Sequence, residues 1–193
     1  MRLLLARHGE TGDQYAGRYI GATDLPLSVT GREQARRLRT VLPTGICRCL
    51  CSPMLRARQT AELALAGNDC RVEILDALRE VDFGRWEGLS FAEIVSQDEG
   101  LVADWQRDGL AFQFPGGEHT RSFWQRVQAA LVLITELPEV EVLVICHGGV
   151  IRAMICSLLG LSFEHYLLFA VQPAALTVFE VDGQRGVLQG LNL

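Results

Sequence analysis

The sequence predicts an α/β fold: a three-layer sandwich with a mostly parallel central sheet flanked by helices. Short apolar runs alternate along the chain with segments of helical periodicity, which is typical of βαβ units. Several runs are apolar throughout, as strands are when helices cover both faces of a parallel sheet. The chain has 193 residues, no internal repeat and no linker-like tract, so we expect one domain over residues 1–193.

The first half of the chain supplies three expected strands and two expected helices. The strands are Arg2–Ala6, Arg48–Ser52 and Val72–Leu75. Between the first two, a helix over 30–42 begins with Thr30 and Glu33 at the spacing of a capping box. After the second strand, Ser52 is the expected N-cap of a helix over 52–65, because proline follows it at a favourable first helical position.

The second half continues the alternation. Apolar residues recur with a 3.6-residue period over 119–137, which predicts an amphipathic helix. The expected strand Val142–Cys146 follows, and a helix over 148–160 begins at the glycines directly after it. Leu176–Val181 is the last expected strand. The apolar C-terminal stretch "VLQGLNL" is either an edge strand or a contact surface, so the oligomeric state stays open, a homodimer included.

Composition excludes several classes of protein. Hydrophobic residues make up 49% and charged residues 21% of the chain, the balance of a globular protein. The net charge of −5 disfavours a nucleic-acid partner, which would require a basic surface. No apolar run approaches the roughly 18 residues of a membrane span, and no signal peptide is recognisable. We expect a soluble, cytoplasmic protein without a membrane partner.

Three of the six cysteines, Cys47, Cys49 and Cys51, alternate in a way that places them on one face of a strand. A zinc site usually pairs Cys-x2-Cys with a second, distant pair, and the sequence has no such arrangement. We therefore expect small core residues of a reduced protein and no metal site.

Polar residues stand at or near the ends of four expected strands. Arg7 and His8 follow the first strand, Arg56 lies in the helix after the second, Glu80 follows the third, and His147 follows the fourth. In α/β sheets, ligands bind beyond the carboxyl ends of the strands. We therefore expect these five residues to converge at one edge of the sheet.

This set of residues suits phosphoryl transfer. Two arginines can hold a phosphate dianion, and the helix start at Gly148 adds free N–H groups. Arginines lower the pKa of a neighbouring histidine and keep it neutral, as a nucleophile must be. A carboxyl group can protonate a leaving alkoxide and then deprotonate water. Such a reaction passes through a phosphohistidine and needs no metal or cofactor. Sequence motifs of P-loop, dinucleotide-binding and G-x-S-x-G proteins are absent.

Four blocks resemble the histidine phosphatase superfamily, also called phosphoglycerate mutase-like, in order and in spacing. They are "ARHGET" at 6–11, "CSPMLRARQTA" at 51–61, "LREVDFGRWEG" at 78–88 and "CHGGVIRAM" at 146–154. The resemblance implies that His8 is the nucleophile and that Arg7 and Arg56 bind the phosphate. It also implies that His147 hydrogen-bonds the phosphoryl group and that Glu80 is the acid and base.

Further substrate contacts are implied at less distinctive positions. Gln14 stands where the family often has asparagine and is expected to donate to the phosphate. Gly21 matches a position where backbone approaches the substrate. Gly148 begins a helix and is expected to bind the phosphate through its free N–H group. The family's "PGGES" reads "PGGEH" here, so His119 either begins a helix or touches substrate. The segment Tyr15–Tyr19 either lines the mouth of the site or packs as a surface loop.

The compact length, "DFGRWEGLSFAEI" and "FPGGE" are similar to the α-ribazole phosphatases, which remove the 5′-phosphate of α-ribazole 5′-phosphate. This similarity implies a metal-independent phosphomonoesterase whose partner is a small phosphate monoester. Broad-specificity and sugar-phosphate phosphatases share these features and remain alternatives. A phosphoglycerate mutase and a non-catalytic phospholigand-binding protein are the other hypotheses, but the short chain disfavours the first and the complete residue set disfavours the second.

Overall fold

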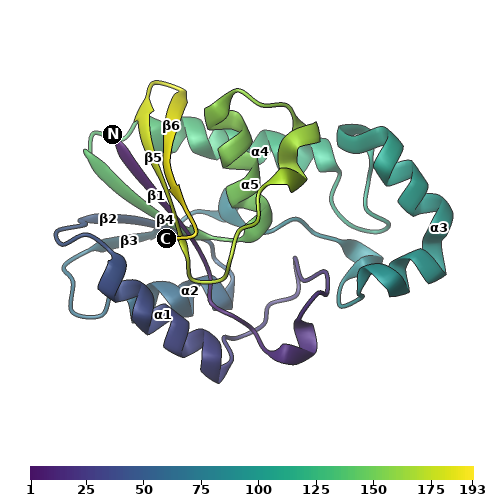
Figure 1. Cartoon of the computed structure of the whole chain (residues 1–193), viewed down its shortest axis with the longest axis horizontal. Coiled ribbons are helices and arrows are strands. Elements are labelled where there is room, and N and C mark those ends of the chain that lie inside the picture. The colour runs from purple at the N-terminus through teal and green to yellow at the C-terminus, as the bar shows by residue number, and fades with distance from the viewer.

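A six-stranded sheet forms the centre of the computed structural model, which describes residues 1–193. The strand order is β3-β2-β4-β1-β5-β6 (Figure 1). The strands are β1 (Arg2–Arg7), β2 (Arg48–Cys51), β3 (Arg71–Ile74), β4 (Glu141–Cys146), β5 (Leu176–Asp182) and β6 (Arg185–Leu191). The first four strands of that order pair in parallel, and β5 and β6 add an antiparallel edge. The predicted α/β sandwich with a mostly parallel sheet is confirmed.

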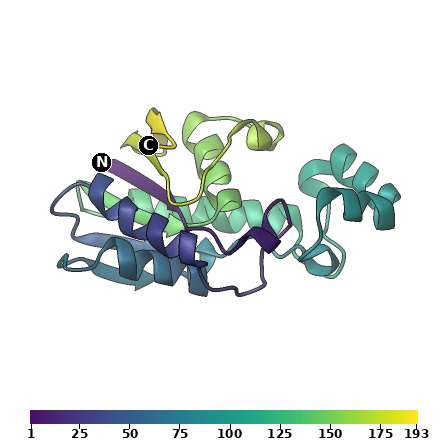
Figure 2. The same ribbon diagram turned by 60° about the horizontal axis from the view of Figure 1, so that its bottom comes forward.

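Five α-helices surround the sheet. They are α1 (Val29–Val41), α2 (Leu55–Ala64), α3 (Phe91–Asp108), α4 (Thr120–Thr135) and α5 (Gly148–Leu159). Helices α1 and α2 cover one face, and α4 and α5 cover the other (Figures 1 and 2). Helix α3 stands apart from the sheet, beyond the far end of α4 and α5 (Figures 1 and 2). None of the helices combines the length and apolar character needed to cross a membrane.

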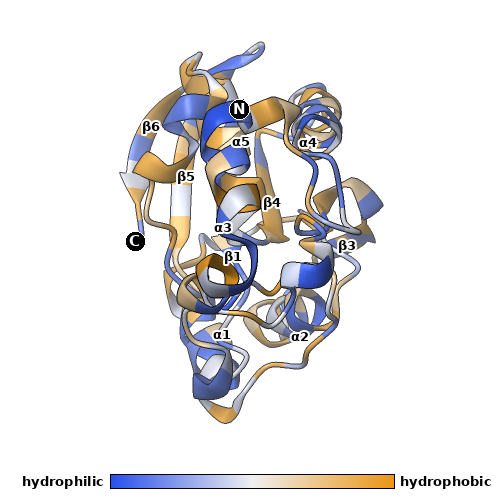
Figure 3. Cartoon of the chain, turned by 90° about the vertical axis from the view of Figure 1, so that its right-hand side faces the viewer, coloured by the Kyte–Doolittle hydropathy of each residue, from blue (hydrophilic) through white to orange (hydrophobic).

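The two faces of the sheet are buried in separate hydrophobic clusters. Leu3 and Leu5 of β1 belong to the cluster under α4 and α5, and Leu4 and Ala6 belong to the one under α1 and α2. Because successive side chains of a strand point to opposite faces, every residue of β1 between Arg2 and Arg7 must be apolar. The same is true of most of β4, which is coloured as hydrophobic in Figure 3, whereas α1 carries both colours as an amphipathic helix.

Two predicted helix starts are wrong. Helix α1 is capped by Ser28, whose Oγ accepts a hydrogen bond from the Gly31 N–H at 3.0 Å, and Thr30 lies within the helix. A serine just before the helix satisfies the free N–H group first, so the expected capping box does not form. Helix α2 begins at Leu55, after Met54 as N-cap, and not at Ser52. The Ser52 hydroxyl instead contacts a histidine of the site described below.

Three further features refine the expectations. The sequence analysis predicts no helix at α3. The signal for one is the capping box that Ser90 and Glu93 form at its start. The C-terminal stretch forms the edge strand β6, one of its two predicted forms. Cys49 and Cys51 are buried as expected, but Cys47 is exposed because it precedes the first residue of β2.

Candidate active site

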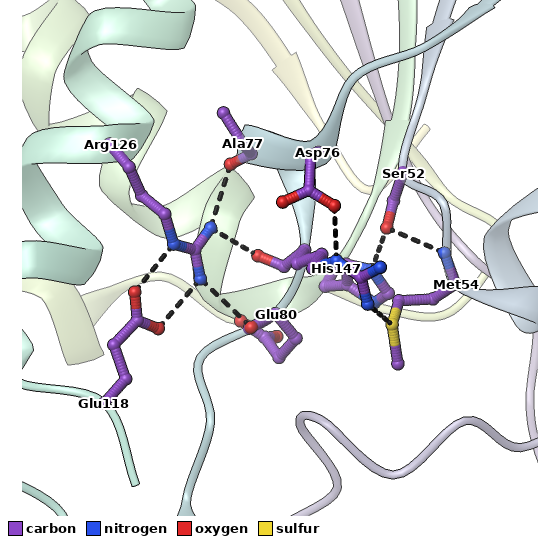
Figure 4. Close-up of polar contacts among 9 residues, drawn as sticks. Ser52, Met54, Asp76, Ala77, Glu80, Glu118, Arg126 and His147 are labelled. Atoms are coloured by element: carbon purple, nitrogen blue, oxygen red, sulfur yellow. Dashed lines mark hydrogen bonds and ion pairs between the residues drawn. The ribbon is translucent and has the colours of Figure 1, made fainter.

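Neighbouring strands bring two histidines together. Strands β1 and β4 run parallel with Arg7 opposite Cys146, so the next residues, His8 and His147, emerge side by side at the carboxyl ends. Their ring centroids lie 5.1 Å apart, and both rings are buried. The adjacent strand β2 ends at the same level and places Ser52 against His147 (Figure 4).

Hydrogen bonds assign the tautomer of each ring. Nδ1 of His8 lies 2.7 Å from the carbonyl oxygen of Gly9, which can only accept, so Nδ1 carries the proton and Nε2 keeps its lone pair. The Ser52 hydroxyl lies 2.7 Å from Nε2 of His147, and its oxygen accepts the Met54 N–H at 3.3 Å. The Ser52 hydroxyl proton has no other acceptor within hydrogen-bond distance, so we assign it to Nε2, which leaves the Nδ1–H of His147 free to donate. The site thus holds one nucleophilic nitrogen and one donor.

Two arginines, one fully buried and one partly buried, face the histidines. Arg56 is fully buried, and its Nη atoms donate to the carbonyl oxygens of Thr23 and Gly21, each at 2.8 Å. Arg7 donates through Nη1 to the Val171 carbonyl oxygen at 2.7 Å. These bonds fix the two guanidinium groups to the backbone on their outer sides.

Three donors of this cluster have no protein partner. They are Nε of Arg7, Nε of Arg56 and Nδ1 of His147, all buried. An unpaired buried N–H group costs about 1–3 kcal/mol, so native proteins rarely keep three at one place unless a ligand receives them. All three are donors and two are cationic. The arrangement fits an oxyanion with several oxygens, such as a phosphoryl group.

The environment keeps both histidines neutral. Burial, followed by the charges of Arg56 and Arg7, holds the pKa of His8 well below its usual value near 6.5. Burial, followed by His8 and the same arginines, does the same to the pKa of His147. The sequence analysis expected the arginines to lower the histidine pKa, and the structure shows that burial lowers it more than the arginines do. His8 is therefore unprotonated at neutral pH, the state in which an imidazole can act as a nucleophile.

Glu80 enters the site from a loop that follows the 3-10 helix Asp76–Leu78. Its Oε2 accepts the Gly149 N–H in the first turn of α5 at 2.8 Å. A Cβ at Gly149 would collide with Oε1 of Glu80 and with the hydroxyl of Tyr166, so only glycine allows this approach. The carboxylate is thus held at the positive end of a helix.

A cavity of about 690 Å³ opens beside these groups. Arg7, Glu80, Gly148 and Gly149 contribute to its wall. Eight aromatic residues also line it: Tyr19, Phe83, Phe91, Trp105, Phe114, Phe123, Phe163 and Tyr166. Several of these rings contact one another edge to face, including Tyr19 with Phe83 at 5.0 Å and Phe83 with Phe114 at 5.1 Å between centroids. The cavity therefore joins an anion site to an aromatic wall.

Comparison with known proteins agrees with this geometry. The model of the histidine phosphatase superfamily (branch 1) matches residues 3–193. The chain belongs to the histidine phosphatase superfamily. It is 32% identical over 194 residues to an adenosylcobalamin/alpha-ribazole phosphatase of Escherichia coli strain K12, covering 100% of this chain and 96% of that protein. It is 30% identical over 198 residues to phosphoserine phosphatase 1 of Hydrogenobacter thermophilus, covering 100% and 92%.

Solved structures of histidine phosphatases share the fold. A putative alpha-ribazole-5′-P phosphatase from Escherichia coli K-12 superposes with a TM-score of 0.91 at 32% identity, covering 100% of this chain and 96% of that chain. An alpha-ribazole phosphatase from Shigella flexneri gives a TM-score of 0.90 at 31% identity, with the same coverage.

The structure brings together most residues that the sequence singled out. His8, His147, Arg7, Arg56 and Glu80 form one cluster, linked by the contacts and charges described above. Gly148 also lies there, because a Cβ on it would stand 3.6 Å from Nε of Arg7. These placements support the roles that the histidine phosphatase resemblance implies.

The structure shows the surroundings of Gln14 and Gly21, whose expected contacts with substrate stay predictions. Gln14 is exposed and does not line the cavity; its carbonyl oxygen accepts from Nε of Arg18. Gly21 uses its N–H on Glu87 and its carbonyl on Arg56, and a Cβ on it would collide with the Val81 carbonyl oxygen. Gly21 thus anchors Arg56 and offers no free polar group of its own.

The structure also places the remaining loop residues of the sequence analysis. Arg18 and Tyr19 line the cavity, and Tyr15 does not. His119 is the N-cap of α4, since its Nδ1 accepts the Arg121 N–H at 3.1 Å. The helix-starting role of His119 is therefore confirmed.

Sequence reasoning missed two residues that organise the histidine phosphatase site. Ser52 sets the tautomer of His147, but a serine before proline had a sufficient local explanation as a helix cap. The Glu87 carboxylate accepts the backbone N–H groups of the Gly21–Thr23 loop, the loop whose carbonyls hold Arg56. Glu87 lies in the quoted block "LREVDFGRWEG", which was the one available signal.

Acid should destabilise this fold. His8 and His147 stay neutral in the folded state, whereas the unfolded chain takes up a proton at each near pH 6.5. The free energy of unfolding should fall below about pH 6.5, by up to about 1.4 kcal/mol per pH unit for each histidine, until the folded pKa values are reached. Urea unfolding at about pH 7.5 and about pH 5.5 measures this slope, and His8→Ala should reduce it. A slope unchanged by His8→Ala would contradict a neutral His8.

Proposed function

We propose that this chain hydrolyses phosphate monoesters through a phosphohistidine on His8, and that its substrate is α-ribazole 5′-phosphate. The observation that carries the reaction is the trio of unpartnered buried donors beside a neutral histidine: Nε of Arg7, Nε of Arg56 and Nδ1 of His147. Three inward donors can receive the oxygens of a phosphoryl group that His8 attacks.

The reaction has two displacements. Nε2 of His8 attacks phosphorus, the ester P–O bond breaks, and the carboxyl group of Glu80 gives its proton to the departing alkoxide oxygen. Glu80, now a carboxylate, takes a proton from a water molecule that attacks the phosphohistidine. The P–N bond breaks, which releases inorganic phosphate and returns the electron pair to His8. In both steps, Arg7 and Arg56 offset the charge on the phosphoryl oxygens, and the Nδ1–H of neutral His147 donates a hydrogen bond to one of them.

The aromatic wall supports the substrate assignment. α-Ribazole is a riboside of dimethylbenzimidazole, a flat apolar group that can stack against aromatic rings. A cavity of about 690 Å³ lies within the range of small-molecule sites, and eight of its lining residues are aromatic. The related proteins named as alpha-ribazole phosphatases match the whole of this chain. A small polar leaving group, such as serine, would leave this wall without a partner.

Relative kcat/KM values across phosphate monoesters test the proposal. The panel contains α-ribazole 5′-phosphate, phosphoserine, 3-phosphoglycerate, fructose 2,6-bisphosphate and p-nitrophenyl phosphate. We expect α-ribazole 5′-phosphate to exceed the other alkyl esters by about 100-fold or more, because the wall binds the transition state of this substrate alone. Equal values for all alkyl esters would refute the assigned substrate and leave the phosphatase chemistry in place.

A variant of the wall makes the test sharper. Phe91 lines the cavity and is 45% exposed, so its replacement should not disturb the core. Phe91→Ala should lower kcat/KM for α-ribazole 5′-phosphate about 5-fold, the usual worth of an aromatic contact, and leave phosphoserine unchanged. Leu133→Ala is the matched control, because Leu133 is an exposed residue of α4 outside the cavity. Parallel losses on both substrates would contradict an aromatic subsite.

A further inference from the structure

Arg126 of α4 holds the loop that carries Glu80 (Figure 4). Its Nη1 donates to the carbonyl oxygens of Ala77 at 2.8 Å and Arg79 at 2.7 Å, and its Nη2 donates to that of Glu80 at 3.0 Å. We propose that Arg126 is the positioning residue for the acid and base Glu80, an inference that rests on the proposed function.

Every donor of the guanidinium group is used. Besides the three bonds to loop carbonyls, Nε donates to Oε1 of Glu118 at 2.7 Å and Nη2 donates to Oε2 at 2.9 Å. A guanidinium group has five N–H bonds in a fixed plane, and five acceptors receive them here. The bidentate ion pair with Glu118 therefore fixes the plane of the guanidinium group. Because the remaining three N–H bonds lie in this plane, they also fix the positions of the three loop carbonyls.

Two of the three carbonyls that Arg126 holds, those of Arg79 and Glu80, lie outside regular structure. The 3-10 helix ends at Leu78, and the next one begins at Gly84, so Glu80 lies in an irregular stretch. Helix α4, in contrast, is anchored in the core through Phe123 and Val127 on either side of Arg126. Arg126 thus ties the backbone around Glu80 to a helix that is anchored in the core.

Arg126 binds the backbone of Glu80, whereas α5 binds its side chain. The carbonyl of Glu80 is bound by Arg126, and its carboxylate accepts the Gly149 N–H at 2.8 Å. A displacement of about 1 Å in a catalytic group can cost about 100-fold in rate. Loss of the arginine should therefore impair proton transfer by Glu80, without altering the arginines and histidines that hold the phosphoryl group.

The leaving group separates this role from general support of the fold. An alkoxide needs a proton from Glu80 as it departs, whereas the p-nitrophenolate anion leaves without one. Because kcat/KM reports only the steps up to the first irreversible one, it isolates transfer to His8 from the later hydrolysis. We compare α-ribazole 5′-phosphate with p-nitrophenyl phosphate for each variant.

Arg126→Lys is the principal variant, because lysine keeps the charge but lacks the planar fork. We expect kcat/KM to fall about 30- to 100-fold for the alkyl ester and less than about 3-fold for the aryl ester. Glu118→Gln should show the same selectivity with a smaller loss, since Arg126 then keeps its bonds to the loop. Arg121→Lys, an exposed arginine on the same helix, should change neither ester. Equal losses on both esters, or no loss on either, would overturn the proposal.

A second measurement does not depend on activity. Hydrogen exchange of the peptide over 76–83 should be about 10-fold faster in Arg126→Lys than in wild type, with exchange in β1 and β4 unchanged. Unchanged exchange in that peptide would also overturn the proposal. If the wild-type protein hydrolyses neither ester, the proposed function fails, and the exchange experiment still decides whether Arg126 holds the loop.

Discussion

His8→Ala should lower kcat/KM for every phosphate monoester by about 10⁴-fold or more, because no other group can form the covalent intermediate. Nε2 of His8 is the only nucleophilic nitrogen with a free lone pair beside the three inward donors. The fold should persist, because the variant removes a buried polar ring that carries no charge. Turnover and thermal unfolding of the same preparation measure both effects.

Covalent labelling tests the same prediction directly. Brief incubation with a phosphate-labelled ester, followed by quenching in alkali, should trap label on the wild-type chain and none on His8→Ala. His119→Ser is the matched control, since serine is also a good N-cap and His119 lies outside the cavity. Label retained by His8→Ala would show that another residue is the nucleophile.

Arg56→Lys should reduce kcat/KM by about 100- to 1,000-fold, although the charge is kept. The Arg56 side chain makes two bonds to the carbonyls of Gly21 and Thr23 and still presents Nε to the site. A lysine ammonium has three donors at one atom and cannot hold this loop while also reaching a phosphoryl oxygen in the same geometry. The loss should extend to alkyl and aryl esters alike, in contrast to that of Arg126→Lys.

The neighbouring arginine supplies the control for this variant. Arg58 lies on the same helix, two residues away, and is exposed. Arg58→Lys should leave kcat/KM and the unfolding midpoint unchanged. A wild-type rate for Arg56→Lys would mean that charge alone, and not the planar fork, stabilises the transition state.

Short stretches of sequence were enough to predict the sheet and the cluster of histidines and arginines at its edge. An apolar run such as Leu3–Ala6 indicates a strand covered on both faces, and the polar pair Arg7 and His8 follows it directly. Because the carboxyl ends of parallel strands meet at one edge, the residues after β1 and β4 could be placed together before any distance was known. Local order along the chain was sufficient for these positions.

Predictions from neighbouring residues were wrong where a side chain had a second possible partner far away in the sequence. Ser52 had the neighbours of a helix cap, yet its hydroxyl bonds with His147, 95 residues away. The rest of the fold sets this contact, because β2 and β4 are neighbours in the sheet and place Ser52 beside His147.

The sequence by itself therefore determined the fold class and the gathering of two histidines, two arginines and a carboxylate at one edge of the sheet. Only the tertiary structure decided what surrounds them. The cavity wall combines Tyr19, Trp105 and Phe163 from three separate segments, and Arg126 reaches the Glu80 carbonyl from 46 residues away. Such contacts leave no periodicity or spacing in the sequence, because they depend on distances between elements that are fixed only when the two hydrophobic clusters close around the sheet.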